Sequence, residues 1–140
     1  VFLDAGFLIA LAVKNDQFHQ SAEKLLSKVI KNRIRLLTSN YVVQEAVTRI
    51  VYNAGFRTAK IFIDRLNRLE KEGLVNIVWI DRIIHNLSIE YLSKYKDHPF
   101  SFVDASIIAV VKQLKIDLIY TTDSVLRATG LNVILLDKKR

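Results

Sequence analysis

Short apolar runs alternate with longer stretches of helical period along the whole chain, and this alternation constrains the fold more than any other feature. Runs of a few residues that are apolar almost throughout are typical of strands buried on both faces of a sheet. Strands that alternate with helices predict an α/β domain built around a mainly parallel sheet. Five such strands are predicted, at Val1–Asp4, Arg33–Thr38, Val75–Ile80, Leu118–Thr121 and Val133–Leu136.

The stretches between these runs carry apolar residues at helical spacing. Asn40 is a suitable N-cap, and Gly73 is a natural C-terminal stop for the helix that follows Gly55. Because the crossovers are long enough to hold pairs of helices, we expect one domain over residues 1–140, a three-layer α/β/α sandwich with about five strands. The helices are predicted at Ala5–Val13, Gln17–Ile30, Asn40–Asn53, Arg57–Glu72, Asp81–Tyr95 and Ser101–Leu114.

Composition narrows the class of function. The chain has no cysteine, which excludes a disulfide framework, a zinc–thiolate site and a cysteine nucleophile, and which fits a reducing, cytoplasmic setting. No run approaches the ~20 apolar residues that a membrane-spanning helix needs. The formal charge of +7 favours a polyanionic partner, nucleic acid foremost. The alternative is that the basic residues form a solvated surface with no polyanionic partner. The same two interpretations, phosphate contact or solvated surface, apply to clusters such as Lys24, Lys28 and Lys31.

Four acidic residues stand out from the ordinary surface carboxylates. Asp4 and Asp123 each follow a predicted strand, at the sheet edge where open parallel sheets bind their ligands. Glu45 is closely flanked by apolar residues, and Asp104 shares a helical stripe with Ile107 and other apolar side chains. A charge on such an inward stripe is costly unless it is paired or bound to a metal.

Each of the four also has a simpler explanation. Asp4 and Asp123 are suitable caps for the helical segments that follow them. Glu45 has an i,i+4 partner in Arg49, and Ser101 with Asp104 fits the capping-box pattern. Together, however, three or four clustered carboxylates raise one another's pKa and call for a hard cation, for which Mg²⁺ or Mn²⁺ is suited. Such a site activates water for phosphoryl chemistry, so residue placement alone suggests a nuclease.

The same acids lie in longer motifs, at Phe18–Ala22, Leu37–Glu45, Ser101–Ala109 and Ile119–Asp123. With Asp4 at the end of the first strand, these motifs resemble the PIN-domain family almost end to end. The resemblance is strongest to the VapC-like toxins of prokaryotic toxin–antitoxin pairs. The order and spacing of the motifs, rather than any single motif, make the resemblance specific.

The resemblance implies a Mg²⁺- or Mn²⁺-dependent endoribonuclease that cleaves single-stranded RNA with metal-activated water. Asp4, Glu45, Asp104 and Asp123 match the family's acidic quartet, and Thr121 matches the hydroxyl residue two positions before the fourth acid. It also implies a small antitoxin partner that inserts a basic side chain into the acidic pocket, and a homodimer. A stand-alone RNA-processing nuclease and a vestigial RNA-binding module remain alternatives.

The chain departs from the family pattern at two places. Ala5-Gly6 stands where a small polar residue usually follows the first acid, and Ser124 stands in a region where an aromatic residue is common. A phosphoacceptor signalling domain, the remaining rival, requires a lysine near the last strand, and Val133–Leu136 has none.

Outside the acidic quartet, few residues suggest chemistry. His19 is expected to be structural, and Trp79 is expected in the core rather than as a platform for stacking bases. His85 and His98 have no recognisable partner pattern, and Ser101 lacks the context of a catalytic serine.

Overall fold

Five short strands form one sheet with the order β3-β2-β1-β4-β5, and every neighbouring pair is parallel. The computed structural model describes all residues from Val1 to Arg140. Each predicted strand is present but shorter than its apolar run. The strands are β1 (Phe2–Leu3), β2 (Leu36–Ser39), β3 (Val75–Val78), β4 (Ile119–Thr121) and β5 (Val133–Leu135). The central position of β1 makes it a direct neighbour of both β2 and β4.

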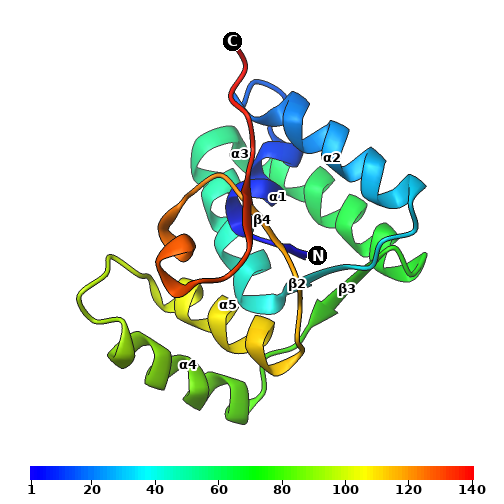
Figure 1. Ribbon diagram of the computed structural model, residues 1–140. Helices are drawn as coiled ribbons and strands as arrows, with labels where there is room; N and C mark the ends of the chain where they lie inside the picture. The colour runs from blue at the N-terminus through cyan, green and yellow to red at the C-terminus, as the bar shows by residue number, and fades with distance from the viewer.

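The helices form two groups, with the sheet between them (Figure 1). In one group α1 packs against α2 and α3, and in the other α4 packs along α5. This arrangement confirms the predicted three-layer sandwich. The helical elements are α1 (Ala5–Ala12), α2 (His19–Lys31), α3 (Asn40–Lys71), α4 (Arg82–Lys94), α5 (Phe102–Gln113) and the short 3-10 helix η1 (Val125–Thr129).

The two helices predicted on either side of Gly55 are continuous in α3, which kinks at that glycine. Gly55 has φ 86° and ψ 164°, a conformation that is essentially restricted to glycine. The prediction that Asn40 caps this helix is wrong by one residue. The Oγ of Ser39 accepts from the backbone N–H of Val42 at 3.2 Å, whereas the side chain of Asn40 accepts from the N–H of Ile80 at 2.8 Å. Asn40 therefore ties the start of α3 to the chain that leaves β3.

The hydrophobic core runs through the middle of the sheet and takes in most of α1 and α5. Every residue of α1 from Ala5 to Leu11 is buried, as is every residue of α5 from Ala105 to Val111. The expectation that Trp79 lies in the core is wrong, because β3 ends at Val78 and the indole is 74% exposed. No helix in the chain combines the length and the apolar character that crossing a bilayer demands. The rigid core fixes the residues that directly precede α1 and follow β4.

Candidate active site

Asp4 lies at the carboxyl end of β1 and forms the centre of the site. Its Oδ1 accepts from the N–H of Ala5 at 2.6 Å, so Asp4 caps α1 as the simpler explanation expected. Its Oδ2 accepts from the hydroxyl of Thr121 at 2.5 Å. The Thr121 hydroxyl in turn accepts from the N–H of Asp123 at 3.1 Å. Thr121, at the end of the adjacent β4, therefore fixes the orientation of Asp4 and the backbone position of Asp123.

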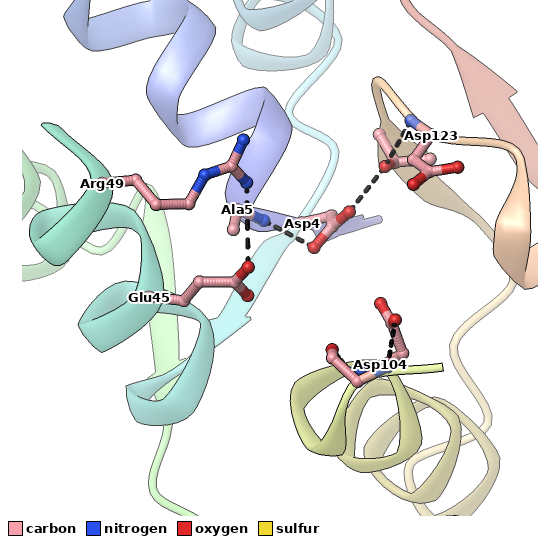
Figure 2. A network of polar contacts seen from close by, with 8 residues as sticks. Asp4, Ala5, Glu45, Arg49, Asp104 and Asp123 are labelled. Carbon is pink, nitrogen blue, oxygen red and sulfur yellow. Dashed lines mark hydrogen bonds and ion pairs between the residues drawn. The ribbon is translucent and has the colours of Figure 1, made fainter. Parts of the chain in front are cut away.

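All four predicted carboxylates line one pocket of about 220 Å³. Glu45 reaches the pocket from the second turn of α3, and Asp104 reaches it from the first turn of α5. Figure 2 shows these two residues and Asp123 arranged around Asp4. The acids come from four different elements, so the fold brings together what the sequence separates.

The capping box predicted at Ser101 is present. The N–H of Ser101 donates to Asp104 Oδ2 at 2.8 Å, and the N–H of Asp104 donates to Ser101 Oγ at 3.1 Å. Asp123 has a comparable local role, since its Oδ1 accepts from the N–H of Val125 at the start of η1. Capping and a place in the acidic pocket are thus compatible. In Asp4, Asp104 and Asp123, one carboxylate oxygen accepts from a backbone N–H while the residue lines the pocket.

Burial is the main cause of unusual proton affinity in this pocket. Desolvation raises the pKa of Asp4 above its ordinary value, the Thr121 and Ala5 hydrogen bonds oppose the rise, and Asp104 adds to it. The pKa of Glu45 is raised by desolvation and then by the charge of Asp4, against a lowering by Arg49. The pKa of Asp104 is raised by desolvation and, to a lesser degree, by Asp123, while its hydrogen bonds to Ser101 act against the rise. The carboxylates thus repel one another in a partly dehydrated space.

Arg49 is the one cation at this pocket, and it compensates only Glu45 directly. Its Nη1 lies 3.7 Å from Glu45 Oε1, and both side chains are partly exposed. A pair at this distance with solvent access contributes little stability. The net charge among the pocket's acidic and basic side chains therefore remains negative.

The donor set fits a hard divalent cation, because every acidic ligand offers carboxylate oxygen and none offers sulfur or nitrogen. In the arrangement described here, no three acidic side chains are close enough to hold an ion together. A site with three of these carboxylates as ligands therefore requires Glu45, Asp104 or Asp123 to turn toward Asp4, which is already fixed by its two hydrogen bonds.

One contact in the pocket was not anticipated from the sequence. Gly6, which lines the pocket, lies so close to Thr122 that a Cβ at position 6 would overlap the Thr122 hydroxyl and come within 3.2 Å of Thr122 Cβ. The departure at Ala5-Gly6 thus has a steric reason in this chain. Thr122 occupies the space that a side chain at position 6 would take.

All three histidines lie outside the acidic pocket. His19 Nδ1 is 2.7 Å from the carbonyl oxygen of Ala10, which confirms its structural role between α1 and α2. His98 stacks against Phe100 with ring centroids 5.4 Å apart. His85 contacts Tyr41 and lines a groove next to the acidic pocket.

The family model of the PIN domain matches residues 1–131. The chain belongs to the PIN-domain family. It is 26% identical to the 23S rRNA-specific endonuclease VapC20 of Mycobacterium tuberculosis over 130 residues, which cover 93% of this chain and 94% of that protein. These findings confirm the resemblance to PIN domains and to VapC-like toxins.

Solved structures agree with this assignment. The crystal structure of M. tuberculosis VapC20, described as a sarcin-ricin loop cleaving toxin, has a TM-score of 0.81 at 25% identity and covers 93% of this chain and 95% of its own. FitAcB from Neisseria gonorrhoeae has a TM-score of 0.66 at 17% identity, with 95% of both chains covered, and shows the shared fold alone. The PIN-like fold predicted from the sequence is therefore confirmed.

Proposed function

We propose that this PIN domain is a Mg²⁺- or Mn²⁺-dependent endoribonuclease that cleaves single-stranded RNA. The observation that carries the proposal is the convergence of Asp4, Glu45, Asp104 and Asp123 on one pocket, with the pKa of the first three raised by burial and mutual repulsion. A pocket of this kind on a chain with charge +7 suits a polyanionic substrate. The similarity to an rRNA-specific endonuclease over nearly the whole chain supports RNA as that polyanion.

In this proposal the four carboxylates hold the divalent ion, and each protein group has a defined task. When bound, the ion would lower the pKa of a coordinated water molecule and neutralise charge on the phosphate. Thr121 keeps Asp4 Oδ2 oriented and favours its ionised form. Arg49, at the rim of the pocket, is placed to pair with a phosphate once Glu45 turns toward the ion. A vestigial RNA-binding module gives no reason for four clustered carboxylates to be retained at an energetic cost.

We further propose that the chain is the toxin of a VapBC-type pair. The toxin designation of the VapC20 structure supports this role. A small antitoxin would then place a basic side chain in the acidic pocket, where it would relieve the same repulsion that a cation relieves. We also expect a homodimer, which sedimentation of the purified chain would detect as twice the monomer mass.

The first test is cleavage of a panel of single-stranded RNAs, together with a 23S rRNA fragment that contains the sarcin-ricin loop, in Mg²⁺, Mn²⁺ or EDTA. Asp104→Asn should abolish metal-dependent cleavage, because the amide lacks the charge that holds the ion, while its oxygen can still accept from Ser101 N–H. Asp64→Asn is the matched control, since Asp64 pairs with Lys60 on the exposed surface of α3. Full activity in Asp104→Asn would show that the assigned site is wrong.

A further inference from the structure

A second and larger hollow opens directly beside the acidic pocket. It has a volume of about 630 Å³ and shares Glu45 and Arg49 with that pocket. Pockets of a few hundred Å³ with mixed apolar and polar walls are of the size that binds small organic groups. The two hollows are therefore adjacent, with Glu45 and Arg49 in the wall between them.

Three aromatic rings form the apolar wall of this groove, which we call the aromatic groove: Tyr41 from α3, His85 from α4 and Phe102 from α5. The centroids of His85 and Phe102 are 5.2 Å apart, and those of Tyr41 and Phe102 are 6.2 Å apart. The Tyr41 hydroxyl and His85 Nδ1 are 2.7 Å apart, a hydrogen bond that fixes both rings. The wall is thus held in place before any ligand binds.

These rings are not part of the hydrophobic core. Tyr41 and Phe102 are neither in the core cluster nor packed against it, although the adjacent Val103 is packed against it. All three rings are only half-buried. Because the three rings line a hollow and lie outside the core, their remaining exposed surface is available for a ligand.

We propose that the aromatic groove is a nucleobase subsite, in which one unstacked base of the RNA lies against Tyr41 and Phe102 while an adjoining phosphate lies at the acidic pocket. This proposal rests on the proposed ribonuclease function. Single-stranded RNA is recognised mainly by stacking its splayed bases on aromatic side chains. Arg49 at the junction of the two hollows supplies the positive charge that a phosphate needs.

The polar part of the groove favours RNA over an apolar peptide. Gln44 and Thr48 are exposed residues of α3, one helical turn apart, and both line the same groove. Their amide and hydroxyl groups can both donate and accept hydrogen bonds, as base edges require. An aromatic face together with such groups and Arg49 matches the base, its edge and its phosphate.

The test uses a short single-stranded RNA that carries 2-aminopurine, whose fluorescence falls when the base stacks, in EDTA so that the RNA stays intact. Tyr41→Leu and Phe102→Leu should weaken binding by about fivefold or more, since stacking on one aromatic side chain contributes at least this much per base. Both variants should also lose the fluorescence change. Tyr52→Leu is the matched control, because Tyr52 is on the same helix, is 85% exposed and does not line the groove.

Two further variants keep the test independent of folding. Phe102→Tyr and Tyr41→Phe each retain a ring and should bind RNA more tightly than the corresponding leucine variants, although Tyr41→Phe loses the hydrogen bond to His85. Circular dichroism melting checks that every variant is folded. RNA affinity and fluorescence in the leucine variants equal to those of Tyr52→Leu would overturn the subsite, and a groove that serves a protein partner would give that result. Metal-dependent cleavage is scored separately. A stacking signal without any cleavage would support the subsite while refuting the nuclease.

Discussion

The close approach of Gly6 and Thr122 makes Gly6→Ala an informative perturbation. A new Cβ would overlap the Thr122 hydroxyl and would lie 3.2 Å from Thr122 Cβ and 3.3 Å from its Cγ2. Overpacking of this kind costs about 1–3 kcal/mol. Replacing a helical glycine with alanine returns up to ~1 kcal/mol through helix propensity. We therefore expect Gly6→Ala to lower the free energy of unfolding by about 1 kcal/mol.

The same substitution should have the opposite sign when Thr122 is already alanine. Thr122→Ala removes the hydroxyl and Cγ2, which leaves one contact at 3.2 Å. Gly6→Ala should then raise the free energy of unfolding by a few tenths to ~1 kcal/mol. Urea denaturation of the four proteins gives the coupling energy, which we expect to be ~2 kcal/mol. Equal effects of Gly6→Ala in both backgrounds, within about 0.5 kcal/mol, would refute this steric explanation.

Three other predictions concern the site and the kink. Thr121→Val removes a hydrogen bond that lowers the pKa of Asp4, so the acidic limb of RNA cleavage against pH should move to higher pH; an unmoved limb would contradict the role of Thr121. Because burial raises the pKa of Asp4, Glu45 and Asp104, the folded chain holds protons more tightly than the unfolded chain. Stability in EDTA should thus fall as pH rises from about 4 through these raised pKa values, and Mn²⁺ should raise the melting temperature more at about pH 7 than at about pH 4; equal stabilisation at both would argue against metal binding by these groups. Gly55→Ala should cost about 1–3 kcal/mol in urea denaturation, although no atom crowds the position, because its backbone conformation suits only glycine; no loss would mean that the kink readily relaxes.

Local patterns predict most of the fold because they act over a few residues. All five strands and the cap at Ser101 follow from apolar runs and short polar motifs. The error at Asn40 arises because Ser39 and Asn40 are both good N-caps, and the choice depends on Ile80, forty residues away. Trp79 is misplaced for a related reason, since the apolar pattern does not show that β3 ends one residue earlier.

The four acidic residues of the pocket were predictable from the sequence, whereas the residues around them were not. Asp4 and Asp123 could be placed at the same site because each follows a strand, and the carboxyl ends of parallel strands lie at the same edge of the sheet. The contact between Gly6 and Thr122 is invisible in the sequence, since neither residue type suggests the other. The aromatic groove is equally hidden, because Tyr41 and His85 are 44 residues apart and fit no common motif. Long-range packing determines both features.

The hydrogen bond between Asp4 and Thr121 joins residues 117 positions apart. It forms only when β4 pairs with β1. A nascent chain that has left the ribosome only as far as α4 lacks Asp104, Thr121 and Asp123. The acidic pocket is therefore completed only after the chain as far as Asp123 has been made and folded, so any activity of that pocket must wait for β4 to join the sheet.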